Sequence, residues 1–328
     1  MERNLLVDRL KGYACFLVLF GHVIMGVRLA GIDIPSFFWD LEKVIWSFHV
    51  ALFMFLSGTV YRMTGEWRGK KTRLGFIAHK LLGLGIPYVV FSAVYILINS
   101  LVGQVNTQSS VWDILWIWKT PVAQYWFLYA LFFLFCIWAL LSRFLKNWMI
   151  TLLTVAASYA VPLLGGTLGC FDIVFGSALA FGLGTCVNIA TLTKVPLWGK
   201  ILGVAAHIAA GFALAKLDLI EKPILDECIM LLGILASIWL FSIIGAWKPL
   251  DRFLLFMNKY SFQTYLLHTI FTAGIRIVLL RVHINWWWVH VLVGTLFGIG
   301  CSVLASVIAK KMKFPNFFFF PTKYLSKK

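Results

Sequence analysis

The sequence contains few charged residues. Asp, Glu, Lys and Arg make up 13% of its 328 residues, whereas hydrophobic residues make up 61%. Soluble domains carry roughly 25% charged residues, so this composition predicts a polytopic membrane protein. The net charge of +16 would favour nucleic acid binding in a soluble protein. Here the Lys and Arg residues lie in short segments between apolar runs, where they report membrane topology, so we expect no nucleic-acid partner.

Several motifs of catalysis and metal binding are also absent. The chain has no Walker loop, no GxSxG and no HExxH, which leaves ATP hydrolysis, a serine-hydrolase triad and zinc peptidase chemistry without support. Its six cysteines form neither a CxxC pair nor a Cys/His cluster, so we expect no metal site and interpret each cysteine as a small buried residue. No clear internal repeat suggests the paired halves of a transporter. No cleavage site follows the charged start, so we expect the first span to be retained.

Apolar runs of about 20 residues predict an all-α transmembrane helix bundle. We expect one transmembrane domain over residues 1–328, without an appended soluble domain. The ten expected spans lie near residues 8–29, 43–63, 76–99, 124–142, 148–165, 170–190, 200–217, 227–246, 258–280 and 286–309. Placing both termini in the cytosol puts most of the 29 Lys and Arg residues on that side, and many of the acidic residues on the other.

The first expected span includes the ionisable residues Lys11 and His22. Lys11 and His22 are eleven residues apart, which places them about 20° apart on one helix face and about 16 Å apart along its axis. Ionisable groups inside a membrane are costly and usually face a bundle interior or a wet cavity. Asp8 lies one turn before Lys11 and can pair with it, so a snorkelling interfacial lysine remains an alternative for Lys11.

Other polar side chains interrupt the later spans. They are His49 and Ser57 in SFHVALFMFLSG, Gln124, Tyr125 and Trp126 in QYWFLYALF, and Tyr265 and His268 in YLLH. Any single histidine could be a satisfied core residue, but three of them in spans one, two and nine favour a shared polar cavity. A neutral His22 could act as a general base there. The group that would orient its ring is not evident from the sequence.

A basic segment follows the second span, from Arg62 to Lys80, and includes Arg73. It serves either topology alone or the attraction of a polyanionic ligand such as a nucleotide-bearing cofactor.

These motifs together resemble the acyltransferase-3 family of multispan membrane acyltransferases. The segment VDRLKGYACFLVLFGH is similar to the first-span signature of that family, with Lys11 and His22 at the basic and histidine positions. SFHVALFMFLSG, HKLLGLGIPY, YWFLYALF and YLLH resemble later motifs in the expected order. Gly83 stands where many relatives have a second arginine, as in the subgroup of fucose 4-O-acetylase type. Lys11 stands where the family commonly has an arginine, and a lysine cannot form the bidentate hydrogen bonds of a guanidinium group.

The resemblance implies transfer of an acyl group, usually acetyl from cytosolic acetyl-CoA, to a hydroxyl of an envelope glycan or lipid-linked sugar in the bacterial inner membrane. No permanently bound cofactor is expected. The predicted site comprises a catalytic group of His22, Asp8 and His49, a donor group of Lys11, Arg9, Lys80 and Arg73, and an acceptor group of Ser57, Trp126, Tyr265 and His268. A transporter or flippase of a lipid-linked sugar, and an acyltransferase that uses another donor such as succinyl-CoA, remain alternatives. Direct transfer and an acyl-enzyme step both remain open.

Overall fold

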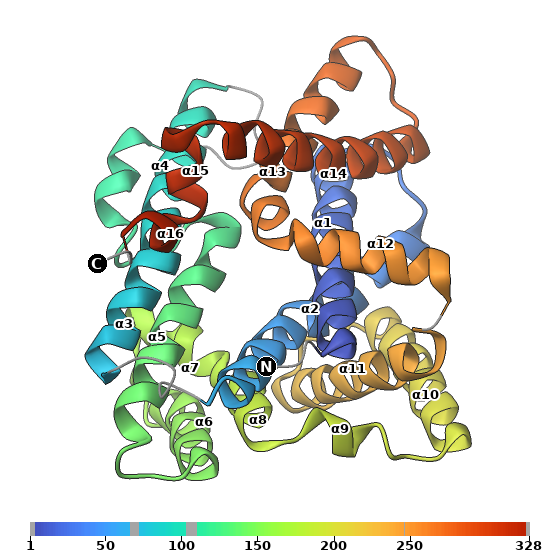
Figure 1. The fold of residues 1–328 in the computed structure, drawn as a ribbon. Coiled ribbons are helices and arrows are strands. Elements are labelled where there is room, and N and C mark those ends of the chain that lie inside the picture. The colour runs from blue at the N-terminus through green and yellow to red at the C-terminus, as the bar shows by residue number, and fades with distance from the viewer. Residues whose placement is uncertain (1–3, 66–71, 103–109, 246, 326–328) are drawn as a thin grey trace. The chain divides into compact units, whose positions relative to one another are not determined.

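The computed structural model describes residues 4–65, 72–102, 110–245 and 247–325. Within these ranges the regular structure is entirely helical, and nine helical segments are long and apolar enough to cross a membrane. The fold is therefore a polytopic helix bundle, as the apolar runs predict (Figure 1).

The helices follow one another along the chain with short connections. The long ones are α1 (Leu5–Leu29), α2 (Ser36–Met63), α4 (Ile86–Leu101), α5 (Trp126–Leu141), α6 (Asn147–Leu163), α10 (Leu197–Lys216), α11 (Pro223–Ile244), α13 (Ser261–Arg281) and α14 (Trp287–Lys311). Shorter ones are α3 (Arg73–Lys80), α7 (Asp172–Gly176), α8 (Ala178–Cys186), α9 (Ile189–Leu192), α12 (Lys248–Lys259), α15 (Lys313–Phe319) and α16 (Pro321–Leu325).

Among the described residues, nine of the ten expected spans are candidate crossings; the tenth, and details of two others, need correction. The segment expected near residues 148–165 forms α6, whose 17 residues make it shorter than the other nine candidates. The span expected at 43–63 begins earlier, at Ser36, so that Glu42 is a helical and buried residue rather than part of a loop. The span expected at 170–190 consists of a single 3₁₀ turn (Gly169–Phe171) followed by α7 and α8. Apolar length predicts a crossing, but not where its helix is interrupted.

The cysteine interpretation is also wrong for most positions. Cys15 is buried, but Cys186 and Cys228 are exposed, and all six thiols are free. Positions on the outer surface of a membrane bundle face apolar lipid, which accepts small apolar side chains. A cysteine in a membrane protein therefore gains little from being buried inside the bundle.

The helices form two compact units. Unit 1 comprises Met1–Phe53 and Ile189–Val307, and unit 2 comprises Met54–Asn188 and Ile308–Lys328. In unit 1, α1 packs against α11, α12 and α13, and α10 packs against α11. Gly12 makes the contact with α12 close, because a Cβ at this position would collide with the Leu254 carbonyl group. Arg9 joins the same two helices through Nε, which donates to Asp251 Oδ1 at 2.7 Å.

In unit 2, α6 packs against α8, and α5 packs against α3 and α7. Trp138 on α5 is fully buried and donates from Nε1 to Thr185 Oγ1 at 3.1 Å. Gly58 and Gly184 face carbonyl groups of Phe181 and Phe55, respectively, which leaves no room for a Cβ at either glycine. Gly58 and Gly184 therefore allow α2 and α8 to pack closely against each other.

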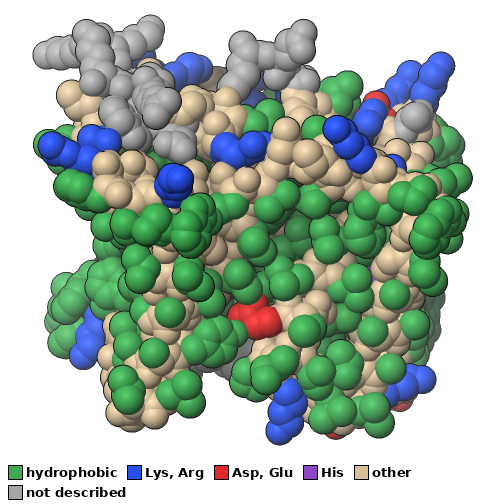
Figure 2. Space-filling view, turned by 90° about the horizontal axis from the view of Figure 1, so that it is seen from below, with side chains coloured by type: hydrophobic (Ala, Val, Ile, Leu, Met, Phe, Trp, Pro, Cys, Tyr) green, Lys and Arg blue, Asp and Glu red, His purple; other side chains and the backbone are tan. Residues whose placement is uncertain are grey.

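The surface agrees with membrane insertion. On the face shown in Figure 2, hydrophobic side chains dominate the middle, and many Lys and Arg side chains lie towards its borders. Such a distribution suits a hydrocarbon layer between two polar interfaces.

Candidate active site

Lys11 and His22 lie on one uninterrupted helix. Asn4 caps the start of α1 by accepting the Val7 N–H through its side-chain oxygen at 3.2 Å, and the helix continues to Leu29. The helical spacing that the sequence predicts therefore holds for this pair, with about 16 Å along the axis. Both side chains are partly exposed, whereas neighbours such as Leu10 and Leu19 are fully buried.

A backbone carbonyl orients the His22 ring. His22 Nδ1 lies 2.8 Å from the carbonyl oxygen of Val18, one turn earlier on α1. A carbonyl oxygen only accepts hydrogen bonds, so Nδ1 carries the proton in the neutral ring. Nε2 is then unprotonated, which is the state that a general base requires. The orienting group that the sequence does not reveal is thus the main chain of the same helix.

The three histidines of spans one, two and nine form one cluster in unit 1. The His22 ring lies 4.9 Å from the His268 ring of α13 and 4.9 Å from the Trp46 ring of α2, as measured between centroids. Trp46 in turn lies 4.9 Å from His49 on the same helix. The three rings that the sequence predicts to share a polar cavity therefore lie close together, through His22 and Trp46.

All three imidazoles are held in the same way. His49 Nδ1 lies 2.6 Å from the Ile45 oxygen, and His268 Nδ1 lies 2.9 Å from the Thr264 oxygen. Both residues are fully buried, and neither Nε2 atom has a hydrogen-bond partner within the described part of the chain. Buried polar atoms without partners are rare and often belong to functional sites, where water or substrate completes them. His22 differs in being partly exposed, which makes it the accessible base of the three.

An ion pair lies beside the cluster. Arg28 near the end of α1 binds Glu42 of α2 through two hydrogen bonds, from Nε to Oε2 at 2.9 Å and from Nη2 to Oε1 at 2.8 Å. The Glu42 carboxylate is buried, and the Arg28 guanidinium balances its charge.

The predicted donor residues of α1 occupy its first turns. Asp8 acts electrostatically on the Lys11 ammonium group, as the i, i+3 spacing predicts. Arg9 is engaged with Asp251, so at least part of its guanidinium joins helices.

Four other predicted residues belong to unit 2. Lys80 places Nζ 3.8 Å from the centre of the Phe135 ring, a cation–π contact, and Arg73 begins α3. Trp126 begins α5, and Ser57 lies in the second half of α2. Each is partly exposed. Arg68, Lys70 and Lys71, which lie near them in the sequence, are outside the described residues.

Comparison with known proteins decides the family. The family model described as an acyltransferase domain, Acyl_transf_3, matches residues 4–307. The chain belongs to the acyltransferase-3 family. This acyltransferase match includes α1 to α13 and therefore every described residue of the histidine cluster.

One curated relative also matches. The nodulation protein NolL of Mesorhizobium japonicum is 29% identical over 164 residues, which is 48% of this chain and 42% of NolL. The alignment thus covers less than half of either protein. No solved structure matches the chain.

Sequence reasoning missed three parts of this candidate site. Trp46 precedes His49 by three residues on α2, so helical spacing could have placed it on the same face. No local signal pairs Arg28 with Glu42. Arg276 of α13 lies where a Cβ on Gly26 would be, and both residues lie within the helical spans. In the described residues, no group of three His, Cys, Asp or Glu side chains is placed to hold a metal ion.

Proposed function

We propose that this acyltransferase moves an acetyl group from cytosolic acetyl-CoA to a hydroxyl of an envelope glycan or lipid-linked sugar, with His22 as the general base. The hydrogen bond from His22 Nδ1 to the Val18 oxygen carries the proposal, because it leaves Nε2 free to accept a proton. A bacterial inner membrane is the proposed location, with both termini in the cytosol.

The reaction needs one proton acceptor near the reacting atoms. Nε2 of His22 removes the proton of the acceptor hydroxyl as its oxygen attacks the thioester carbonyl. The C–S bond breaks, and the resulting thiolate of coenzyme A takes the proton from the imidazolium. Direct transfer of this kind is simpler than a route through an acyl-enzyme.

The donor approaches from the Lys11 end of α1. A lysine ammonium is a suitable partner for the phosphates of coenzyme A, and Asp8 helps to keep it charged at the membrane edge. Arg9, Lys80 and Arg73 are further candidates for contacts to the same polyanion. The axial distance of about 16 Å to His22 suits an extended pantetheine arm.

The remaining predicted residues have supporting roles. His49 and Ser57 are candidates to orient His22 or to stabilise the oxyanion, and Trp126, Tyr265 and His268 are candidates for contacts to the acceptor. Support is direct for His268, because its ring touches that of His22. Tyr265 lies on the same helix, and its carbonyl oxygen is 2.9 Å from His268 Nδ1.

The decisive test separates donor binding from chemistry. Acetyl-CoA binding is measured by calorimetry in nanodiscs for the wild type, Lys11→Ala and His22→Ala, and thiol release from acetyl-CoA is followed in membranes that contain the native acceptor. We expect Lys11→Ala to weaken binding about tenfold or more. We expect His22→Ala to retain binding and to lose transfer by about 10²-fold or more. His207→Ala removes another buried imidazole, on α10, and serves as the control.

Each outcome has a definite meaning. Near-normal transfer by folded His22→Ala protein eliminates His22 as the base, and unchanged affinity of Lys11→Ala removes Lys11 from the donor site. A folded wild type that binds succinyl-CoA but not acetyl-CoA shows a different acyl donor. A wild type that binds neither one favours transport of a lipid-linked sugar.

A further inference from the structure

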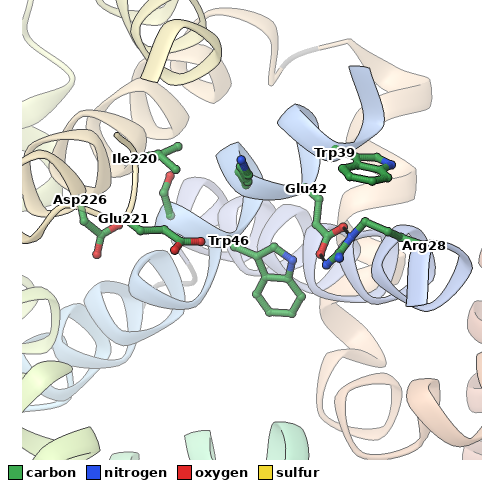
Figure 3. Close-up of a pocket in the computed structure, with 9 residues that line it drawn as sticks. Arg28, Trp39, Glu42, Trp46, Ile220, Glu221 and Asp226 are labelled. Carbon is green, nitrogen blue, oxygen red and sulfur yellow. Dashed lines mark hydrogen bonds and ion pairs between the residues drawn. The ribbon is translucent and has the colours of Figure 1, made fainter. Parts of the chain in front are cut away.

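A pocket of about 470 Å³ adjoins the histidine cluster in unit 1. It lies among the end of α1, the first half of α2, the α10–α11 connection and the start of α11. Its lining includes Trp39, Trp46, Arg28, Glu42, Glu221 and Asp226 (Figure 3). The volume falls in the range of roughly 300–1,000 Å³ that is usual for pockets that hold small ligands.

Trp46 connects this pocket with the proposed base. Its indole lines the pocket and also lies 4.9 Å from the His22 ring. Its contact with His49, whose buried Nε2 has no partner in the described residues, adds hydrogen-bonding capacity next to the same indole. A ligand that packs against Trp46 in the pocket therefore lies one side chain away from His22.

The cations of the pocket are already neutralised. Arg28 forms its two hydrogen bonds with Glu42, and Lys43 pairs with Asp218 and donates to the Ala215 oxygen at 3.3 Å. Glu221 acts electrostatically on Lys43, but neither Glu221 nor Asp226 forms an ion pair with any described residue. In the view of Figure 3, these two carboxylates lie on one side of Trp46 and the Arg28–Glu42 pair lies on the other. The unbalanced charge of the pocket is thus negative.

Two tryptophans with carboxylates around them suit a sugar ring. The C–H faces of a pyranose pack on indole faces, while its hydroxyl groups donate to carboxylate oxygens. Trp39 supports this use, because half of its surface is exposed and the Arg28 guanidinium lies 5.9 Å from its ring centre. A ligand with its own carboxylate or phosphate would meet Glu221 and Asp226 as like charges.

We propose that this pocket binds the acceptor sugar and selects an uncharged or ammonium-bearing pyranose over an anionic one. This inference rests on the proposed acyl transfer and specifies its acceptor. The donor and the acceptor then use opposite ends of α1, since Lys11 precedes His22 and Arg28 follows it. Arg28 lies about 9 Å beyond His22 along the helix axis.

Binding of three methyl glycosides tests the pocket without any chemistry. Methyl glucoside, methyl glucosaminide and methyl glucuronide are titrated by calorimetry into the full chain in nanodiscs. We expect the glucoside and the glucosaminide to bind at least about tenfold more tightly than the glucuronide. The Glu221→Gln/Asp226→Asn double variant should reduce that preference about tenfold and leave acetyl-CoA binding unchanged.

Two variants of Trp39 test whether the sugar stacks on this indole. Trp39→Ala should weaken binding of all three glycosides, and Trp39→Phe should retain part of the affinity. Trp198→Ala removes an exposed tryptophan of α10, outside the pocket, and should change nothing. Equal binding of the glucuronide, or an unchanged preference in the double variant, overturns the selection by charge. If none of the three glycosides binds, the pocket assignment is overturned.

Acyl transfer is measured separately from glycoside binding, as thiol release from acetyl-CoA. If the expected glycosides bind and respond to the variants while no thiol is released from acetyl-CoA, the pocket assignment stands and the proposed function fails. If thiol release occurs but the Trp39 and carboxylate variants leave the use of each glycoside unchanged, the function stands and the acceptor site lies elsewhere.

Discussion

The imidazole rings of His22 and His268 lie 4.9 Å apart, nearly perpendicular at 78°. They come from α1 and α13, which are separated by more than two hundred residues in the chain. Each ring is fixed at Nδ1 by a carbonyl group of its own helix, and contact between the helices places the two rings next to each other. His268 is therefore a candidate to position His22 or the acceptor.

Replacement of His268 by Phe tests this relationship. The variant keeps a ring of similar shape but removes Nε2, the atom that lacks a partner within the described residues. We expect kcat to fall about tenfold with little change in KM for acetyl-CoA, since general acid–base arrangements contribute about 10²–10⁴-fold and His268 is not the base itself. The measurement is steady-state thiol release.

His207→Phe is the matched control for that variant. His207 is also buried, lies 4.9 Å from the Phe48 ring and has an Nδ1 atom without a partner in the described residues. Its variant should keep kcat within about twofold, because it does not touch His22. If both variants behave alike, His268 contributes only packing.

The Arg28–Glu42 pair should matter for stability. Arg28→Gln leaves a buried carboxylate without its cation, so we expect a loss of about 1–3 kcal/mol in free energy of unfolding. The double variant Arg28→Gln/Glu42→Gln should recover part of that loss, because no charge then remains buried and unpaired. Thermal unfolding in detergent measures both effects.

Lys43→Gln provides the comparison for this pair. Its partner Asp218 is largely exposed, so removal of the Lys43 charge should cost no more than about 1 kcal/mol. A double variant less stable than Arg28→Gln alone would contradict the assumed cost of an unpaired Glu42.

The contact between α1 and α12 depends on Gly12. Gly12→Ala introduces a Cβ that must displace the Leu254 carbonyl, and we expect a destabilisation of about 1–3 kcal/mol. Gly274→Ala on α13 meets no atom within 4 Å and should be neutral or slightly stabilising, because alanine is the better helix former. Unfolding temperatures that are equal for the two variants would show that α12 moves without cost.

Arg9 has two possible roles that one comparison separates. Arg9→Gln and Asp251→Asn both break the pair between α1 and α12, so we expect similar losses of stability, about 1–3 kcal/mol each. If Arg9 also holds the donor, Arg9→Gln weakens acetyl-CoA binding and Asp251→Asn does not. We expect the loss of affinity in Arg9→Gln to exceed that in Asp251→Asn by more than about twofold. Equal affinities of the two variants would remove Arg9 from the donor site.

The parts of the fold that depend on local chemistry could be predicted. Apolar runs predict the helices, because backbone polar groups in hydrocarbon must find partners within their own segment. The spacing of Lys11 and His22 predicts a common face, because helical geometry is independent of the neighbours. Local composition did not predict the interruption of the helix between α7 and α8. It also did not predict that α2 extends beyond its apolar part, where charged residues such as Glu42 are helical.

The sequence by itself determined the membrane class, the helical segments, the family motifs and the candidate residues His22, His49 and His268. Only the tertiary structure decided that these rings share one cluster, that Trp46 joins it to a pocket, and that Glu42 receives Arg28 as its partner. The physical reason is that hydrogen bonds within a helix depend on residues three or four positions apart, whereas contacts between helices depend on side-chain packing across the bundle. In this chain, small residues such as Gly12 and Gly26 set the closeness of those contacts.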